Sequence, residues 1–269
     1  MEKKIGFIGC GKMAQAMIAG MINSGVVNPQ DIMASAKTLS TLTGVNNNFS
    51  IQTTLNNQEV AQFSSYLFLA VKPNLYSEVI QEIRNDVWDN TIIITIAAGI
   101  DLDYMEREFG KKVKVVRTMP NTPSLVGEGM SAICHNQYVT EEEMSYVTKL
   151  FSSFGKCEQV PETMMDSIPA ISGSSPAYVY LMIEALADGG VRQGIAREQA
   201  YRLAAQAVLG AAKMVLETGI HPAELKDQVC TPGGATIEAI AALEEHGFRH
   251  SIQEAMKKCT DKAVSLAKK

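Results

Sequence analysis

The sequence predicts a two-part α/β protein, with a mostly parallel sheet between helices over residues 1–160 and an all-α part over residues 161–269. Three observations predict this class. Short β-branched runs alternate with helical periods through the first part, which is the pattern of βαβ units. A glycine turn follows the first of these runs directly. After Pro161 no convincing strand occurs, and stretches rich in alanine, leucine and methionine take over.

The first part contains eight expected strands, short as in a sheet that is covered on both faces. They span residues 4–8, 31–35, 49–53, 66–71, 91–97, 112–118, 130–135 and 157–160. Helices are expected between many of these strands, for example over 13–24, 75–87 and 141–154. In the last of these, Thr140 is the expected N-cap and Glu143 completes a capping box.

The second part is expected to be four long helices, with Gly219 and Gly247 at C-cap positions. They span residues 176–193, 197–218, 235–246 and 248–268. The helix over 197–218 is apolar around most of its circumference and must be enclosed on nearly all sides. A helical unit of this size has limited means to do so alone, so we expect a dimerisation domain.

Composition excludes several classes of protein. With 46% hydrophobic and 20% charged residues, the chain is an ordinary globular protein. Its net charge of −5 argues against a nucleic-acid binder, and no apolar run approaches the ~20 residues of a membrane span. Without a leader-like segment, a cytoplasmic location is expected. The five cysteines are scattered, without a CxxC pair, so no metal site is expected.

The glycine turn after the first strand reads Gly9-Cys10-Gly11-Lys12-Met13-Ala14, or G-x-G-x-x-A. Because it joins a strand to a helix at the start of a βαβ unit, it predicts a Rossmann-like dinucleotide site. Gly9 permits the tight turn, Gly11 lets the backbone approach a pyrophosphate, and Ala14 allows close helix–strand packing.

The end of the second strand predicts which dinucleotide binds. A site for NAD usually places an acidic residue ~20 residues beyond the turn, where it bonds the ribose. Here that position falls in "MASAK", without an acid. Ser35 and Lys37 can instead accept a 2′-phosphate, so NADP (NADPH) is favoured and NAD is possible with lower preference.

Other strand ends are expected at the same carboxyl edge, where ligands bind in open α/β sheets. "LAVKP" and "IAAGI" contribute small residues that let the nicotinamide half approach the backbone, and Lys72 is either a phosphate contact or a solvated loop lysine. Asn56 could reach the adenine ribose, and Asn121 in the rigid "TMPNTP" loop is expected at the substrate. The complete set of expected cofactor contacts is Ile8, Gly9, Cys10, Gly11, Lys12, Met13, Ala14, Ser35, Lys37, Asn56, Ala70, Val71, Lys72, Pro73, Ala97, Ala98 and Gly99.

The helical half indicates which kind of bond is reduced or oxidised. Dehydrogenases that oxidise β-hydroxyacids on a similar layout carry a catalytic lysine on the first long helix of this half. Here "SGSSPAYVYLMIEALADGGV" has neither lysine nor histidine. Because alcohol–ketone interconversion needs a group that moves a proton at the oxygen, an imine substrate fits better.

Five stretches, "GFIGCGKMAQAM", "AVKP", "RTMPNTP", "SGSSPAY" and "LKDQVCTPGGATIEAIAALE", resemble the pyrroline-5-carboxylate reductase family, the last enzyme of proline biosynthesis. The resemblance spans essentially the whole chain, and its last stretch matches the family's specific signature. It implies hydride transfer from NADPH to the C=N carbon of 1-pyrroline-5-carboxylate. It also implies a homodimer, or a higher homo-oligomer, in which helices interleave and each substrate site borrows from a neighbour.

The resemblance further implies a substrate-carboxylate site at Thr231, Gly233, Gly234 and Ala235, with Thr236 bonding the ring nitrogen as the candidate proton donor. On the residues alone, Thr231 is the expected N-cap and Pro232 the first helical residue. Gly233 and Gly234 lower the stability of a helix start. Their presence is explicable if backbone N–H groups here approach a ligand closely. A reductase of another cyclic imino acid and a non-catalytic NADP-binding sensor remain alternatives, although the intact "TPGGAT" counts against the sensor.

Overall fold

The computed structural model describes residues 3–267. Its contacts divide the chain into two compact units. One is Ser175–Lys258, and the other combines the chain before it with the chain from Cys259 onward. The domain border expected near residue 161 stays a prediction.

The first unit is built on one eight-stranded sheet in the order β3-β2-β1-β4-β5-β6-β7-β8. All neighbouring pairs are parallel except β6 with β7, which confirms the predicted mostly parallel sheet. The strands are β1 Ile5–Ile8, β2 Ile32–Ser35, β3 Gln52–Thr54, β4 Tyr66–Leu69, β5 Ile92–Thr95, β6 Lys114–Met119, β7 Gly129–His135 and β8 Gly155–Gln159.

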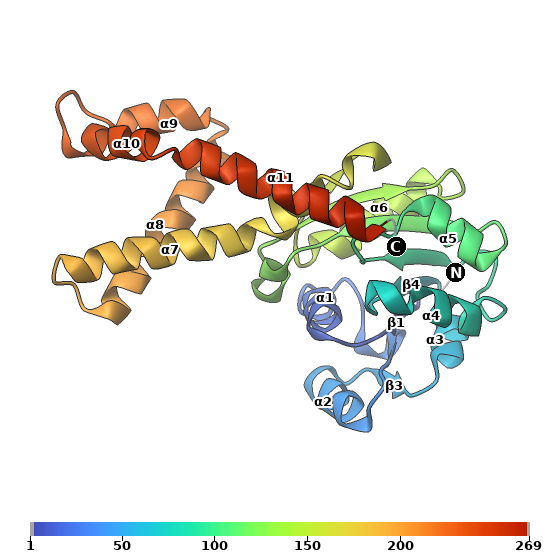
Figure 1. The fold of residues 1–269 in the computed structure, drawn as a ribbon. Coiled ribbons are helices and arrows are strands. Elements are labelled where there is room, and N and C mark those ends of the chain that lie inside the picture. The colour runs from blue at the N-terminus through green and yellow to red at the C-terminus, as the bar shows by residue number, and fades with distance from the viewer. Residues whose placement is uncertain (1–2, 268–269) are drawn as a thin grey trace. The chain divides into compact units, whose positions relative to one another are not determined.

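Helices cover both faces of this sheet (Figure 1). On one face lie α1 Lys12–Asn23, α2 Leu39–Phe49 and α6 Glu141–Ser152; on the other lie α3 Asn57–Phe63, α4 Tyr76–Ile83 and α5 Leu102–Phe109. Strand alternation builds the two cores, because Phe7 and Phe68 stack on the first face while Ile8 and Leu69 enter the second.

Some sequence-based boundaries were wrong. The strand expected over residues 49–53 starts later, since Phe49 still belongs to α2 and Ser50 ends that helix with a φ of 54°. The helix expected over 75–87 spans only Tyr76–Ile83, and no bounds were predicted for α2, α3 and α5. By contrast, the expected all-α second half and the capping box of α6 are confirmed.

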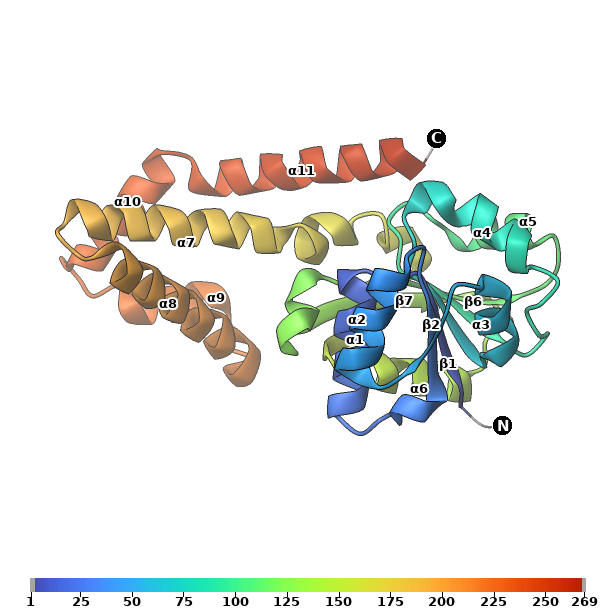
Figure 2. The same cartoon turned by 90° about the horizontal axis from the view of Figure 1, so that it is seen from below.

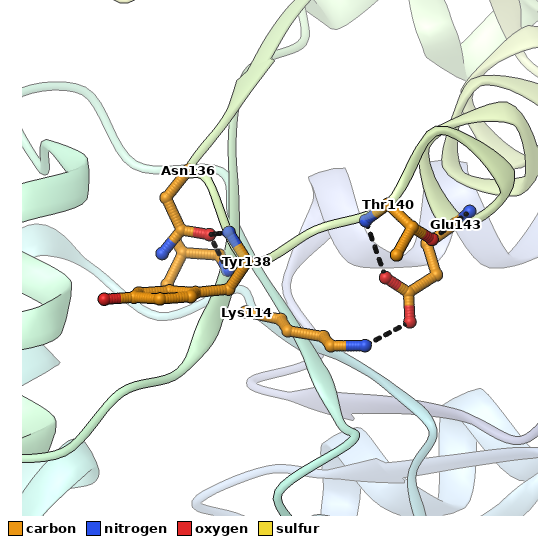
Figure 3. A network of polar contacts seen from close by, with 6 residues as sticks. Lys114, Asn136, Tyr138, Thr140 and Glu143 are labelled. Carbon is orange, nitrogen blue, oxygen red and sulfur yellow. Dashed lines mark hydrogen bonds and ion pairs between the residues drawn. The ribbon is translucent and has the colours of Figure 1, made fainter.

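The capping box of α6 also joins the helix to the sheet (Figure 3). Thr140 N–H donates to Glu143 Oε2 at 2.9 Å, and Glu143 N–H donates to Thr140 Oγ1 at 3.3 Å. Lys114 Nζ on β6 donates to the other oxygen, Glu143 Oε1, at 2.5 Å. Burial alone would raise the pKa of Glu143, but these hydrogen bonds and the lysine charge outweigh it and hold the pKa below its ordinary 4.5.

The strand register brings the predicted loops to one edge of the sheet. Ile8 pairs with both Ser35 and Leu69, and Leu69 pairs with Thr95, so β1, β2, β4 and β5 end level with one another. The chain leaves β1 between β2 and β4, where the strand order reverses. This topological switch point is where ligands bind in open α/β sheets.

The second unit is entirely helical (Figure 2). It contains α7 Ser175–Arg192, α8 Arg197–Thr218, α9 Pro222–Val229, α10 Ala235–Glu245 and the first half of α11 Phe248–Ala267. Gly219 ends α8 in the left-handed region, as predicted. Within residues 3–267, no helix has the length and apolar character needed to cross a membrane.

Very little of the second unit is buried within one chain. Its buried apolar side chains among the described residues are all alanines: Ala187, Ala200 and Ala204. Large apolar side chains on α7 and α8 are exposed instead, including Leu181 at 67% and Leu216 at 79%. Since an apolar surface of this extent is unfavourable in water, another protein surface must cover it.

Candidate active site

The first glycine turn has the geometry of a pyrophosphate cradle. Gly9 adopts a φ of 90°, and a Cβ there would lie 2.8 Å from the Ala70 carbonyl oxygen. Gly11 is the N-cap of α1, without a side-chain cap, and a Cβ at Gly11 would face open space. The N-terminal N–H groups of α1 therefore face an unobstructed region, which fits a dinucleotide phosphate.

The side chains of the turn serve its structure. Cys10 is buried, and burial raises the pKa of its thiol to about 11, so the thiol stays protonated at neutral pH. Gln15 Nε2 donates to the Cys10 carbonyl at 2.9 Å and thereby fixes the turn. Ala14 is buried against the sheet, as its role in close packing requires, while Lys12 is exposed. Because the Cys10 side chain is buried, only its backbone can contact a bound ligand.

Where the adenosine end of the cofactor is expected, Ser35 contacts a residue that the sequence did not single out. Ser35 is only 1% exposed, and its Oγ donates to Asn57 Oδ1 at 2.7 Å. Asn57 also lines a cavity at this edge together with Gly9, Lys37 and Val71. The neighbouring Asn56, which we expected here, accepts from Gln58 N–H at 2.8 Å as the N-cap of α3.

The Ser35 hydroxyl is turned toward Asn57, and its contact with a 2′-phosphate stays a prediction. Lys37 is exposed at the same cavity, with its ammonium available to a phosphate. The doublet "NN" was the only sequence signal for Asn57. Only the hydrogen bond from Ser35, 22 positions earlier in the chain, distinguishes Asn57 from Asn56.

At the β4 and β5 strand ends, buried hydrogen bonds fix the loops. Tyr76 Oη donates to the Leu69 carbonyl at 2.6 Å and lies 2.9 Å from Thr95 Oγ1. Burial raises the pKa of Tyr76, which keeps the phenol protonated. Thr118 Oγ1 donates to the Thr95 carbonyl at 2.9 Å, which ties β6 to β5. The loops that carry Ala70, Val71, Lys72 and Pro73, and Ala97, Ala98 and Gly99, are therefore anchored where they leave the sheet.

A buried arginine stands beside the second of these loops. Arg117 on β6 is 5% exposed and pairs with Asp166 at 2.5 Å and Glu162 at 3.4 Å. Glu162 Oε1 also accepts from Leu102 N–H at 2.8 Å, at the start of α5. A narrow cleft at this point is lined by Ala97, Ala98, Gly99, Arg117, Asp166 and Ala263 of α11. Sequence reasoning gave Arg117 no role.

Asn121 has both ends of its amide engaged within the protein. Its Nδ2 donates to the Ser172 carbonyl at 2.9 Å, and its Oδ1 accepts from Met130 N–H at 2.8 Å. Ser172 belongs to a short π-helical segment, Pro169–Gly173. Asn121 thus holds this segment to the "TMPNTP" loop, and a direct substrate contact stays a prediction.

The second glycine turn differs from the expectation at its start. Thr231 does not cap α10, because Gly234 is the N-cap and Ala235 the first helical residue. Gly234 N–H donates to the Thr231 carbonyl at 3.0 Å, and Gly233 between them has a φ of 68°. With Pro232 before Gly233, this is the pattern of a type II turn.

This turn leaves the N-terminus of α10 available to an anion. No side chain caps Gly234, and Gly233, Gly234 and Ala235 are at least partly exposed. A Cβ at Gly234 would lie 2.4 Å from Thr231 Oγ1, so the glycine lets that hydroxyl sit over the backbone. Thr236, in the first turn, is half-buried, and its hydroxyl has no hydrogen-bond partner among the residues that the structure describes. No metal-binding cluster of His, Cys, Asp and Glu occurs among those residues either.

Comparisons with known proteins agree with an N-terminal cofactor-binding part and a helical second part. A family model described as pyrroline-5-carboxylate reductase dimerisation matches residues 162–266, and one described as NADP oxidoreductase, coenzyme F420-dependent, matches residues 4–99. The pyrroline-5-carboxylate reductase of Escherichia coli is 47% identical over 268 residues, covering 100% of both chains.

Solved structures agree over nearly the full length. The pyrroline-5-carboxylate reductase of Coxiella burnetii has a TM-score of 0.93 at 32% identity, covering 99% of each chain. The Plasmodium falciparum pyrroline carboxylate reductase, crystallised with NADP bound, has a TM-score of 0.89 at 31% identity and covers 99% of this chain and 98% of its own.

Fold and site define an NADP-dependent oxidoreductase with a helical dimerisation domain, and the dimerisation domain makes the chain a homo-oligomer. The first glycine turn, open at Gly11, fits this cofactor. The chain belongs to the pyrroline-5-carboxylate reductase family.

Proposed function

We propose that this chain reduces the C=N bond of 1-pyrroline-5-carboxylate to give L-proline, with its two glycine turns holding the two reactants. Membership of the family supports the reaction. One observation supports a separate turn for the cofactor and for the substrate. Two helices, α1 and α10, both begin at glycines without a side-chain cap. When bound, NADPH supplies the hydride.

The residues of the first unit hold the cofactor. Backbone N–H groups from Gly11 to Met13 bind the pyrophosphate, and Lys37 with Asn57 binds the adenosine end. The small residues Ala97 and Ala98 leave room for the nicotinamide, because a larger side chain would occupy that strand edge.

The residues of the second unit hold the substrate. We assign the carboxylate to the turn of Thr231, Gly233, Gly234 and Ala235, since N-terminal N–H groups of a helix favour a bound anion. Thr236 donates a hydrogen bond to the ring nitrogen. Because threonine is a weak acid, its contribution is orientation and electrostatic support, with the proton drawn ultimately from water.

The smallest active form is a homodimer. The uncovered apolar side chains of α7 and α8 support this, because a second copy presents a matching surface.

The test of the reaction is oxidation of NADPH with and without 1-pyrroline-5-carboxylate, run beside the six-membered homologue. Faster oxidation with the six-membered ring would move the assignment to that substrate, and no oxidation with either would refute a reductase.

The test of Thr236 is T236A, with T236S as the matched control. We expect kcat to fall on the order of 100-fold in T236A, while the Kd for NADPH changes less than about twofold. T236S keeps the hydroxyl and should keep most of the activity. Unchanged kinetics in T236A would remove Thr236 from the mechanism.

A further inference from the structure

The adenosine end of the dinucleotide site contains carboxylates that the strand pattern did not reveal. Glu78 and Glu82, both on α4, line the cavity that Gly9, Lys37 and Asn57 also line. An acidic residue directly after β2, the usual ribose ligand in NAD sites, is absent from "MASAK". A different element supplies negative charge at the same place.

Glu82 is linked to the end of β2 by two hydrogen bonds. Ser35 Oγ donates to Asn57 Oδ1 at 2.7 Å, and Asn57 Nδ2 donates to Glu82 Oε2 at 2.7 Å. The buried serine fixes the amide, so Asn57 presents an N–H to the glutamate and holds its carboxylate at the cavity. Glu78, one turn earlier on the helix, and Glu82 are both exposed, so the hydrogen bond from Asn57 is what distinguishes Glu82.

Lys37 and Glu82 have opposite effects on a phosphate bound at this cavity. The 2′-phosphate that distinguishes NADP from NAD carries a charge of about −1.5 to −2 at neutral pH, by analogy with other phosphate monoesters. Lys37 attracts it, whereas a fixed carboxylate repels it. The adenosine and pyrophosphate, common to both dinucleotides, are less affected by that repulsion.

We propose that Glu82 is a specificity-determining residue that weakens the binding of NADP relative to NAD. The proposal rests on the dinucleotide site described above and is independent of the imino-acid substrate. It makes the preference for NADP a balance between Lys37 and Glu82, with Asn57 placing the carboxylate.

The test is equilibrium binding of NADP⁺ and NAD⁺ to the full chain by isothermal titration calorimetry, without imino acid. In E82Q the glutamine keeps an acceptor for Asn57 Nδ2 but loses the charge. We expect the Kd for NADP⁺ to fall about threefold or more at low salt, and the Kd for NAD⁺ to stay within about twofold. Higher salt should shrink the gain.

Two variants control the experiment. E78Q removes a charge from the same helix without touching Asn57, and its gain should be smaller; K37A should weaken NADP⁺ selectively. E82A removes the same charge without introducing glutamine, in case glutamine disturbs the helix. The Kd for NADP⁺ must change in the same direction in E82A as in E82Q. Equal changes for both dinucleotides, no change, or weaker NADP⁺ binding in the Glu82 variants overturns the proposal. Because substrate is absent, failure of the reductase assignment would not alter these readings.

Discussion

The two glycines of the first turn are separable by substitution, although they belong to one motif. An alanine Cβ at Gly9 would lie 2.8 Å from the Ala70 oxygen and 2.9 Å from Val71 Cγ1, at a φ of 90°. Positive φ costs a non-glycine residue about 1–2 kcal/mol, and overpacking adds about 1–3 kcal/mol. We therefore expect G9A to lower the free energy of unfolding by about 2–5 kcal/mol.

G11A is the matched comparison. Gly11 has a φ of −75°, which any residue adopts, and a Cβ there meets nothing within 4 Å. The fold should lose no more than about 1 kcal/mol, because alanine is a poorer N-cap than glycine but meets no clash here. The same Cβ points toward the space assigned to the pyrophosphate, so the Kd for NADP⁺ should rise on the order of tenfold or more, equivalent to about 1.4 kcal/mol.

Urea unfolding at one fixed protein concentration measures the first effect, because the stability of a homo-oligomer depends on concentration. Titration with NADP⁺ measures the second. The reasoning is refuted if G9A is as stable as the parent, or if G11A destabilises the fold as much as G9A does.

Two further predictions concern the sheet. Y76F removes the phenol that serves the Leu69 carbonyl and Thr95, so the free energy of unfolding should drop by about 1–3 kcal/mol; an unchanged urea midpoint would contradict this. E143Q should cost about 0.5–1.5 kcal/mol at neutral pH, through loss of the ion pair with Lys114 and weakening of the cap. Because the folded pKa of Glu143 is depressed, its contribution is complete above 4.5 and is lost as pH falls below that value. Unfolding curves from pH 7 to 3 should show the two proteins converging, and a constant difference would rule the explanation out.

The most regular parts of the fold could be predicted from the sequence. β1, its glycine turn and α1 form a local unit whose spacing is dictated by the backbone, and the capping box at Thr140 is likewise local. Helix α2 was missed because "LSTLTGVNNNF" is rich in threonine and asparagine, which are weak helix formers. It is held by burial of Leu42 and Val45, a tertiary effect that propensity does not report.

The sequence predicted correctly that the candidate loops leave the sheet at one edge, because they follow strand ends. It did not predict the contacts between residues far apart in the chain. Asn57 acquires its position from Ser35 and Glu82, which are 22 and 25 residues away. The predicted bounds placed the start of α10 correctly at Ala235, but the N-cap expected at Thr231 was wrong, although Thr231 and Pro232 are a normal helix opening by composition. The positive φ of Gly233 instead closes a turn and delays the helix to Ala235.

The contact between Gly234 and Thr231 has a consequence for how this chain can vary. A hydroxyl at residue 231 lies 2.4 Å from where any side chain at residue 234 would begin. A larger residue at 234 becomes acceptable only after 231 has lost or moved its hydroxyl, so the order of substitutions matters. A change at residue 231 is therefore the expected first step, and a larger residue at 234 is expected only after it.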